Sequence, residues 1–465
     1  MNTDTTIVAI ATPPGMGAIA VIRLSGNLAI SIVDSVFASN GKSKKLSKQK
    51  AYTVHYGSIV DGNRVIDDVL VSIFKAPHSY TGENIAEVSC HGSVVIQQQL
   101  LELFVRQGAQ MAKPGEFTLR AFLNGKLDLS QAEAIADLIA STSETARRVA
   151  MHQMRGGFSN KLAELREQLL KFTSLIELEL DFADEDVEFA NRNDLVALIN
   201  SILAEINKLA SSFSLGNAIK SGIPVAIVGK PNVGKSTLLN RLLNEEKAIV
   251  SEIAGTTRDT IEDTIHLNGI NFRFIDTAGL RQTTNEIESI GVKRALNKIE
   301  QARIILYLVD AQEEKETILN EVNKIAKKIT DSQKLIVLVN KEDKSDSNHV
   351  APVIDELNAR NILTIATSAK FGQNIEELQQ KLVELGKVDM PENEDVIVTN
   401  VRHYNALINT RKSLEEVLKG IHNNISEEFL SIDIREAINY LGEITGEISN
   451  EEVLGFIFSK FCIGK

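Results

Sequence analysis

Apolar residues change their spacing several times along this chain, and each change predicts a different kind of element. Short apolar runs separated by turn residues predict strands near the start, at Thr6–Ala11, Ile19–Leu24, Ala51–Ile59 and Asp67–Phe74. A helix is expected after them, over Ser93–Gln107. Residues 1 to about 120 are therefore expected to form a mixed α/β unit.

From about Asn124 the spacing becomes helical and stays so to about Ser212. The i, i+3, i+4, i+7 pattern is clearest at Leu129, Ala132, Ile135, Ala136, Ile139 and Ala140. Strands and helices then alternate, with strands expected at Ile223–Val228, Phe272–Ile275, Ile304–Val309, Lys334–Val339 and Leu363–Ala366. Helical spacing returns from about Arg402, so an α/β domain interrupts a helical region whose two halves are expected to pack together.

These switches predict three domains, of the α/β and α classes. Residues 1–122 are expected to form an N-terminal α/β domain, and residues 219–386 an inserted domain with a mainly parallel sheet and helices on both faces. Residues 123–218 and 387–465 are expected to be the two parts of a discontinuous helical domain. The length of 465 residues agrees with this division, because it is too long for one compact core.

Composition narrows the class of protein. The net charge of −12 excludes a surface that is basic overall, although it is compatible with a local basic patch. The two cysteines, Cys90 and Cys462, lie far apart in the sequence, which argues against a disulfide framework and favours a reducing cytosol. The start of the chain has no apolar signal core, and no apolar run is long enough to span a bilayer. We therefore expect a soluble, cytoplasmic protein with no membrane partner.

The segment Gly229–Thr237 carries the strongest chemical signal. It reads Gly-Lys-Pro-Asn-Val-Gly-Lys-Ser-Thr and fits the G-x-x-x-x-G-K-[ST] phosphate loop at each fixed position, between a predicted strand and a predicted helix. Backbone amides of such a loop surround the β- and γ-phosphates, Lys235 neutralises charge that develops between them, and the Ser236 hydroxyl is placed to hold Mg²⁺. The chain is therefore predicted to bind a nucleoside triphosphate.

Two motifs that follow later predicted strands indicate that the nucleotide base is guanine. Asn340-Lys-Glu-Asp343 comes directly after a predicted strand, and the Asp343 carboxylate can accept both the ring N–H and the exocyclic amine of guanine. Adenine does not present these two donors together. Ser368-Ala-Lys370 follows the last predicted strand and is expected to support the base. Each motif alone is typical of ordinary turns, but their order after successive strands predicts GTP.

Two segments between these motifs are expected to sense the γ-phosphate. In Asp276-Thr-Ala-Gly279, the Asp reaches Mg²⁺ through water and the glycine amide faces the γ-phosphate. In Gly255-Thr-Thr-Arg-Asp259, Thr257 is the candidate for a second hydroxyl on Mg²⁺.

The glutamine that orients the attacking water in signalling GTPases is missing from this chain. Leu280 follows Gly279 in its place, and its side chain cannot hold a water molecule. Glu286 and Glu288 lie a few residues downstream, and either could orient the water. Both are also compatible with a purely solvated role on a helix, so the residues alone leave the choice open.

Taken from end to end, the chain resembles the bacterial tRNA modification GTPases of the MnmE (TrmE) family. Outside the GTPase motifs the resemblance rests on Asp4–Gly15, Ile22–Gly26, Tyr80–Glu83, Cys90–Gly92, Lys113–Leu129 and the C-terminal Phe461-Cys-Ile-Gly-Lys465. It implies a GTP-hydrolysing enzyme that works in a heterotetramer with the flavin-dependent partner MnmG (GidA). Together they would modify carbon 5 of the wobble uridine of certain tRNAs, using the one-carbon unit of a 5-formyl or 5,10-methylene tetrahydrofolate.

The resemblance also implies a homodimer built on a folate-binding N-terminal domain. It matches Arg23, Glu87, Lys126 and Lys465 to the folate contacts of the family. A pterin presents a guanine-like pair of donors, which suits a buried carboxylate such as Glu87, and cations suit a glutamate tail or a ring carbonyl. Taken singly, each of these residues also fits an ordinary surface ion pair. Cys462 lies close to this set in sequence, and both chemistry and simple packing remain open for it.

In the GTPase domain the resemblance adds a K⁺ ion. It matches Asn232 to the K⁺ ligand of the family, with further oxygens from Ser251, Ile253 and Thr256. An ion there offsets negative charge between the phosphates, where other GTPases use an arginine finger. Asn232 also fits a loop residue that tolerates unusual backbone angles. The resemblance assigns the water-orienting role to Glu288, which joins Lys235 as a catalytic residue.

The complete set of residues expected to bind GTP combines these motifs. It comprises Asn232, Val233, Gly234, Lys235, Ser236, Thr237, Ser251, Glu252, Ile253, Ala254, Gly255, Thr256, Thr257, Asp276, Thr277, Ala278, Gly279, Asn340, Lys341, Asp343, Ser368, Ala369 and Lys370. The competing class of protein is a ribosome-assembly or RNA-binding GTPase without folate chemistry. Such proteins usually append an RNA-binding module after the GTPase domain, and the helical segment shows no GXXG loop of that kind.

Overall fold

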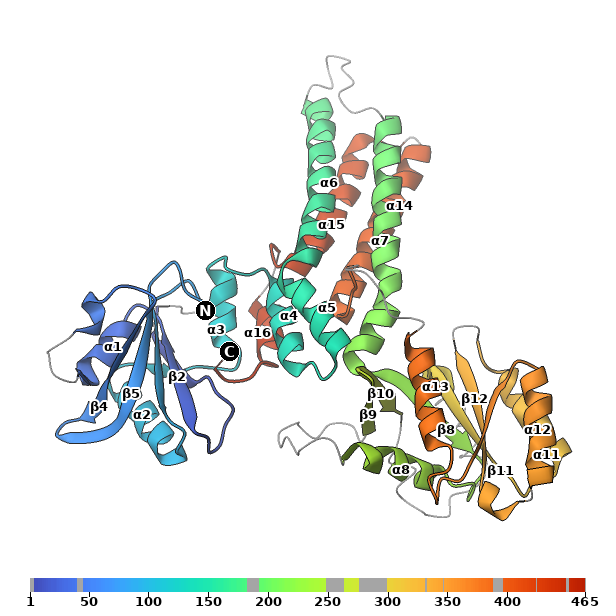
Figure 1. Ribbon diagram of the computed structural model, residues 1–465. Helices are drawn as coiled ribbons and strands as arrows, with labels where there is room; N and C mark the ends of the chain where they lie inside the picture. Colours follow the sequence, from blue (N-terminus) through green and yellow to red (C-terminus); the bar gives the residue numbers. More distant parts are fainter. Residues whose placement is uncertain are drawn as a thin grey trace. The chain divides into compact units, whose positions relative to one another are not determined.

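The fold was obtained as a computed structural model (Figure 1), which describes residues 4–39, 45–181, 192–247, 263–275, 299–330, 333–345, 347–387, 396–423, 425–448 and 451–464. Contacts divide the chain into two compact units. The first unit comprises residues 1–139, 151–204 and 406–465, and the second comprises residues 140–150 and 205–405. Among the described helices, none is both long and apolar enough to cross a membrane.

The first unit begins with a seven-stranded, mainly antiparallel sheet in the order β3-β4-β5-β6-β2-β1-β7. The strands are β1 (Ile7–Ile10), β2 (Ile19–Ser25), β3 (Phe37–Ser39), β4 (Thr53–Asp61), β5 (Arg64–Phe74), β6 (Ile85–His91) and β7 (Gln110–Met111), and between β3 and β4 lies a 3₁₀ helix, η1 (Leu46–Lys48). Helices α1 (Ala29–Val36) and α2 (Val94–Arg106) pack on one face, in the blue region of Figure 1. The predicted strands and helix of this region are confirmed.

Alternation along the strands explains why one face of this sheet is buried. In β5, Val69, Val71 and Ile73 are buried beneath the helices, and the residues between them point the other way. Strand β6 follows the same rule but is missing from the predicted strands. Its run Ile-Ala-Glu-Val-Ser-Cys-His contains small and polar residues, which weaken the apolar pattern of a strand that nevertheless lies at the centre of the sheet.

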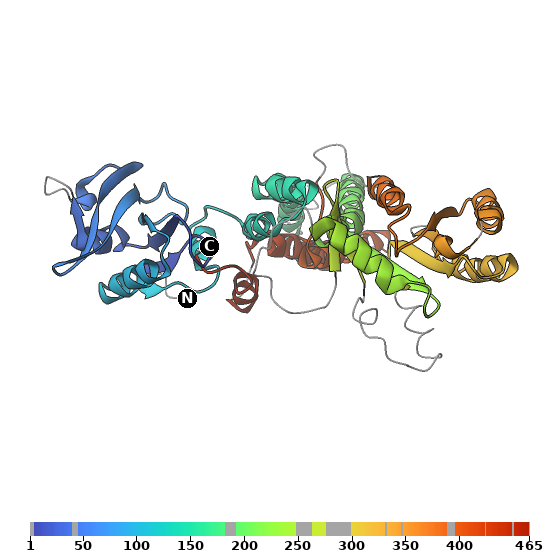
Figure 2. The same ribbon diagram turned by 60° about the horizontal axis from the view of Figure 1, so that its bottom comes forward.

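The rest of the first unit is helical. Its elements are α3 (Glu116–Leu123), α4 (Leu129–Ala140), α6 (Gly157–Asp181), α15 (Glu427–Thr445), α16 (Glu451–Phe458), and parts of α5 (Glu144–Met154), α7 (Arg192–Ser221) and α14 (Val401–His422). Helices α6 and α15 lie side by side although they come from opposite ends of the chain (Figures 1 and 2), and Arg435 Nε donates to Glu177 Oε1 across them at 2.9 Å. The two halves of the helical region therefore pack together.

The second unit contains a six-stranded sheet in the order β13-β12-β11-β8-β10-β9, which is parallel except for β9. Its strands are β8 (Ile223–Gly229), β9 (Asp263–Leu267), β10 (Ile270–Phe274), β11 (Ile304–Asp310), β12 (Lys334–Asn340) and β13 (Leu363–Thr367). Its helical elements include α8 (Lys235–Lys247), α11 (Lys315–Ala326), η3 (Glu342–Lys344), α12 (Ser347–Ala359) and α13 (Ile375–Lys387).

Helices cover both faces of this second sheet, with α8 and α13 on one face and α11 and α12 on the other. Because both faces are buried, the central strands are almost wholly apolar, as β11 shows with Ile-Ile-Leu-Tyr-Leu-Val. Parallel strands end at the same edge of a sheet, so the loops after β8, β11, β12 and β13 meet there. Of the sequence motifs, the phosphate loop, Asn340–Asp343 and Ser368–Lys370 follow β8, β12 and β13 at that edge.

Candidate functional site

The phosphate loop joins β8 to α8, as the motif predicts, and two of its glycines have backbone angles that side chains rarely adopt. Gly229 has φ +154° and Gly234 has φ +103°. A Cβ atom at Gly229 would collide with the carbonyl oxygen of Leu308, and one at Gly234 with the amide nitrogen of Asn340. Glycine at these positions therefore lets the loop lie close to β11 and β12.

Two lysines, Lys230 and Lys235, stabilise the conformation of the phosphate loop. Lys235 Nζ donates to the carbonyl oxygens of Gly229 at 2.8 Å and of Lys230 at 2.5 Å. Lys230 Nζ lies 2.7 Å from Glu313 Oε2 and 2.5 Å from Glu321 Oε1. Hydrogen bonds to these two carboxylates raise the pKa of Lys230 well above its usual range. The loop is thus anchored to the sequence that follows β11.

Asn232 adopts a left-handed backbone, with φ +64°. Asparagine tolerates this conformation better than most residues, so the conformational role considered for Asn232 has a structural basis. Ser236 and Thr237 lie in the first turn of α8, where backbone N–H groups at a helix N-terminus favour anions.

Asn340 connects the base motifs to the phosphate loop. The residue is 2% exposed, and its Nδ2 donates to the carbonyl oxygen of Val233 at 2.7 Å. Its Oδ1 accepts the backbone N–H of Ala369 at 3.0 Å. A single buried amide thus holds three predicted site segments together.

The other base residues are fixed in the same region. Lys341 has φ +67°, and its Nζ forms an ion pair with Asp310 Oδ2 at 2.6 Å. Ser368 is fully buried, and its hydroxyl donates to Asp343 Oδ1 at 2.6 Å. Lys370 is exposed, with its Nζ 5.1 Å from the centre of the Phe371 ring. The structure therefore brings the phosphate loop, Asn340–Asp343 and Ser368–Lys370 to one edge of the sheet.

Part of the predicted site lies outside the described residues. This part comprises Ser251, Glu252, Ile253, Ala254, Gly255, Thr256, Thr257, Asp276, Thr277, Ala278, Gly279 and Glu288. Their roles stay predictions.

In the first unit, two of the four predicted folate residues lie together. Arg23 and Glu87 are opposite one another on β2 and β6, and Arg23 donates through Nε and Nη2 to Glu87 Oε1, each at 2.8 Å. The centroids of the Tyr80 and Phe117 rings lie 5.4 and 5.7 Å from the guanidinium carbon of Arg23. Neither aromatic residue is among the predicted folate contacts, because a single tyrosine or phenylalanine gives no signal of what it stacks on.

The C-terminal tail reaches the same sheet. Gly464 has φ +95° and lies so close to the end of β1 that a Cβ atom there would collide with the Ile10 carbonyl oxygen. Ile10 pairs with Ile22, the residue before Arg23. The backbone N–H of Gly115 also donates to the Cys462 carbonyl oxygen at 3.4 Å. The tail is therefore docked near the Arg23–Glu87 pair, while Lys465 itself lies outside the described residues.

Lys126 is exposed and is placed by a neighbouring turn. A Cβ atom added to Gly82 would lie 3.3 Å from Lys126 Cε, so the lysine stem passes over the Tyr80–Glu83 segment. Arg120, which is 2% exposed, links this turn to two other segments. Its guanidinium donates to Glu83 Oε1 at 3.1 Å in the turn, to Glu116 Oε1 at 3.0 Å and to the Thr5 carbonyl oxygen at 2.6 Å.

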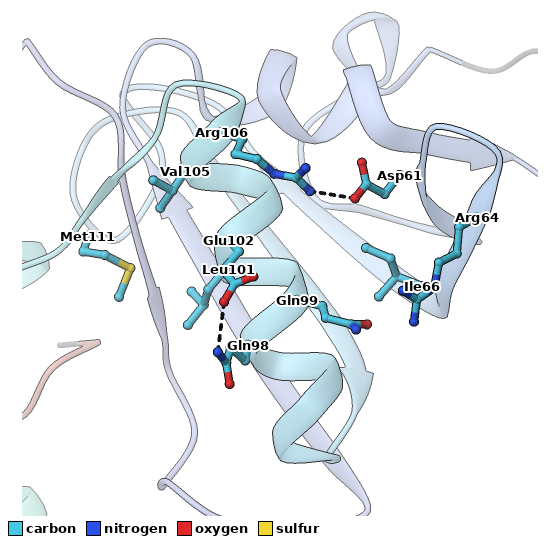
Figure 3. Close-up of a pocket in the computed structure, with 10 residues that line it drawn as sticks. All are labelled: Asp61, Arg64, Ile66, Gln98, Gln99, Leu101, Glu102, Val105, Arg106 and Met111. Atoms are coloured by element: carbon cyan, nitrogen blue, oxygen red, sulfur yellow. Dashed lines mark hydrogen bonds and ion pairs between the residues drawn. The ribbon is translucent and has the colours of Figure 1, made fainter.

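A separate cavity of about 800 Å³ lies between α2 and the β4–β5 hairpin (Figure 3). Four of its polar side chains form two pairs: Arg106 Nη2 lies 2.6 Å from Asp61 Oδ2, and Gln98 donates to Glu102 at 2.9 Å. None of the described residues predicted to bind GTP or folate lines this cavity. We therefore do not place the functional site there.

Comparisons with known proteins cover the whole chain. The family model described as "GTP-binding protein TrmE N-terminus" matches residues 6–126, and the one described as "MnmE helical domain" matches residues 129–462. A curated protein of Flavobacterium johnsoniae called "tRNA modification GTPase MnmE" is 53% identical over 468 residues, with all of both chains covered. One of the same name from Bacteroides fragilis is 52% identical, again over all of both chains.

Among solved structures, one of Aquifex aeolicus Era with GDP and aluminium fluoride is 33% identical to this chain. It covers 41% of this chain and 66% of its own, with a TM-score of 0.27.

Proposed function

This chain belongs to the MnmE family of tRNA modification GTPases, and we propose that its GTP hydrolysis requires K⁺ and drives a folate-dependent modification of the wobble uridine of certain tRNAs. The proposed reaction takes a one-carbon unit from a tetrahydrofolate derivative and requires a flavin-dependent partner of the MnmG (GidA) type. The chain would act in the cytoplasm as a homodimer, within a heterotetramer with that partner.

The observation that carries the GTPase part is the pair of hydrogen bonds made by Asn340. They couple the loop expected to hold the phosphates, at Val233, to the loop expected to hold the base, at Ala369. A nucleotide that bridges these loops meets the Asp343 carboxylate at one end, which suits the ring N–H and amine of guanine. At the other end it meets the Lys235 ammonium and the amides at the start of α8.

The residues of the phosphate loop suit the transfer of a phosphoryl group to water. Lys235 now donates to two carbonyl oxygens of its own loop, and we infer that it exchanges them for phosphate oxygens, where its charge stabilises the transition state. Ser236 and Thr257 would hold Mg²⁺, which supplies charge neutralisation at the β- and γ-phosphates. Glu288 would orient the attacking water, because Leu280 stands where other GTPases have glutamine.

The K⁺ proposal for Asn232 can be separated from a purely conformational role. Asn232→Gly keeps the freedom to adopt φ +64° but removes the side-chain oxygen, whereas Asn232→Asp keeps both. GTP hydrolysis should be measured for both variants in K⁺ and in Na⁺. We expect K⁺ stimulation to be lost in Asn232→Gly and retained in Asn232→Asp. Equal stimulation in the glycine variant and the unaltered chain would rule out Asn232 as a K⁺ ligand.

The folate proposal rests on the Arg23–Glu87 pair. The Glu87 side chain is 24% exposed, and the rings of Tyr80 and Phe117 lie against the guanidinium of its partner Arg23. A pterin offers a pair of donors that suits a carboxylate and a flat ring that suits aromatic neighbours. Glu87→Gln should weaken binding of 5-formyltetrahydrofolate by about tenfold or more, as expected when a charge-assisted pair is lost. Arg106→Gln is the matched control, because Arg106 pairs with Asp61 elsewhere in the same domain. Equal folate affinity in all three proteins would refute the site.

The tRNA part is tested in cells. Mass spectrometry of tRNA nucleosides from a strain without this protein should show loss of the modified wobble uridine, and the unaltered gene should restore it. Complementation with a Glu87→Gln gene should fail if folate chemistry is required. An unchanged nucleoside profile in the deletion strain would instead favour a GTPase without folate chemistry.

A further inference from the structure

Arg241 belongs to the helix of the phosphate loop, but its guanidinium reaches the loop expected to hold the base. The side chain extends from α8, the helix that starts at Lys235. Its Nη2 donates to the Lys370 carbonyl oxygen at 2.6 Å, and its Nε to the Ala369 carbonyl oxygen at 3.4 Å. Neither the motifs nor the resemblance assigns a role to Arg241.

The base loop that receives this guanidinium is a tight turn. The Ser368 carbonyl oxygen accepts three backbone N–H groups, from Phe371 at 3.2 Å, Gly372 at 2.8 Å and Gln373 at 3.2 Å. Gly372 completes the turn with φ +79°, and a Cβ atom there would lie 3.7 Å from the Arg241 guanidinium carbon. The guanidinium therefore packs against the turn as well as bonding to it.

These bonds also direct the backbone of the loop. A trans peptide unit is planar, so a carbonyl and the N–H that follows it point in opposite directions. Because Arg241 holds the Ala369 carbonyl on the side of α8, the Lys370 N–H is turned to the other side of the loop. An N–H in a base loop selects guanine, whose O6 is an acceptor, over adenine, which carries a donor amine at that position.

Two further bonds fix the same loop from the side of β12. Asn340 Oδ1 accepts the Ala369 N–H, and Asp343 accepts the Ser368 hydroxyl. Arg241 adds a third point of attachment, from the phosphate side of the site. A loop held at all three points is pre-organised for its ligand, which reduces the ordering that binding requires.

We propose that Arg241 is a positioning residue for guanine recognition, which holds the Ser368–Lys370 loop against α8 without touching the nucleotide. This proposal rests on the guanine site described under the proposed function. It assigns to Arg241 a share of the affinity and selectivity for the base, and no share in the hydrolysis step.

The test uses the full-length chain and a fluorescent GDP analogue. Arg241→Met removes the guanidinium but keeps a long apolar stem, and Arg241→Lys retains a charge that can reach only part of the turn. Arg360→Met is the matched control, because Arg360 pairs with Glu356 on α12 in the same unit. We expect GDP to dissociate about tenfold faster from Arg241→Met, with an intermediate rate for Arg241→Lys and no change for Arg360→Met.

Selectivity separates positioning of the base loop from general damage. ADP, measured by competition, should bind the Arg241→Met variant as weakly as it binds the unaltered chain, so that the preference for GDP falls by the same factor as its affinity. KM for GTP should rise while kcat stays the same. If the affinity for ADP falls in parallel with that for GDP, or if kcat falls and KM does not change, the substitution has disturbed the binding of the phosphates and the proposal is wrong. An unchanged GDP dissociation rate also overturns it.

The Asp343→Asn variant shows whether a negative result refutes only the role of Arg241 or the proposed guanine site itself. The amide cannot accept both guanine donors, so this variant should lose GDP and prefer xanthosine diphosphate. If Asp343→Asn switches preference and Arg241→Met has no effect, only the role of Arg241 is refuted. If Asp343→Asn binds GDP normally, the proposed guanine site is wrong.

Discussion

Asn340 and Val233 are joined within the candidate nucleotide site by a hydrogen bond of 2.7 Å, in which the buried side-chain amide donates to the backbone carbonyl of the phosphate loop. The other atom of the same amide group accepts from Ala369 at 3.0 Å. Two loops that lie far apart in sequence thereby share one small polar group. Because that group is buried, its bonds are costly to break, and the two loops are expected to hold their spacing without a nucleotide.

Replacing Asn340 by Asp should weaken nucleotide binding strongly. The carboxylate still accepts the Ala369 N–H, but it places an oxygen opposite the Val233 carbonyl oxygen. A buried acceptor left without its donor costs about 1–3 kcal/mol, so GDP dissociation should accelerate about tenfold or more. Stopped-flow fluorescence of a labelled GDP gives the rate. Asn361→Asp, an exposed position in the same unit, is the control and should leave the rate unchanged.

Replacing Arg120 by Met should destabilise the N-terminal domain. Its side chain is 2% exposed and its guanidinium pairs with Glu83 and Glu116, so its removal leaves two largely buried carboxylates without their shared cation. We expect a loss of about 3–5 kcal/mol in the free energy of unfolding, read from hydrogen exchange of the β1 and β6 amides. Arg106→Met removes an exposed pair and should cost about 1 kcal/mol or less. Similar losses in the two variants would contradict this account of the Arg120 network.

Replacing Gly464 by Ala should release the C-terminal tail. The residue has φ +95°, and its added Cβ atom would collide with the Ile10 carbonyl oxygen. A strained backbone costs about 1–3 kcal/mol, so binding of 5-formyltetrahydrofolate should fall by roughly tenfold while GTP binding remains. Calorimetry on the intact protein measures both ligands. Ile463→Ala, at a position that is 58% exposed, serves as control; equal folate binding in both variants would show that the docked tail is not part of the site.

The two cysteines should differ in reactivity. Burial, and then the charge of Asp67, raise the pKa of the Cys90 thiol to about 11, whereas Cys462 is exposed. At pH 8 a thiol reagent should therefore modify one cysteine in the folded protein, and Cys462→Ser should abolish the labelling. Rapid modification of both thiols before unfolding would contradict the burial of Cys90.

The raised pKa of the Cys90 thiol makes the free energy of unfolding fall as the pH rises in the alkaline range. The folded pKa of Cys90 lies above the unfolded one, so the folded protein keeps its proton over a range in which the unfolded chain has lost it. This contribution is complete below about pH 9 and is lost as the pH rises towards 11, with a slope of at most about 1.4 kcal/mol per pH unit. Urea unfolding of the unaltered chain and of Cys90→Ala at pH 8 and 10.5 isolates it. Parallel losses in the two proteins would show that Cys90 does not contribute.

The sequence by itself determined the class of nucleotide, the order of the domains and the family. These conclusions rest on short contiguous motifs, such as Gly229–Thr237 and Asn340–Asp343, whose chemistry follows from residue types at fixed spacing. The alternation of apolar residues also located most strands, because burial of one or both sheet faces imposes a period that can be read along the chain. Among the described strands it missed β3, β6, β7 and β9. In β6, small and polar residues weaken that period.

Only the tertiary structure decided which partners hold the site residues. Lys341 pairs with Asp310, Arg23 lies against the rings of Tyr80 and Phe117, and Arg241 reaches Lys370, all across long stretches of sequence. Each of these residues is individually unremarkable, since an aspartate, an aromatic ring or an arginine occurs in many surroundings. Their roles arise when strands from distant parts of the chain end at one edge or lie side by side. That packing depends on the whole core, so it cannot be read from any local pattern.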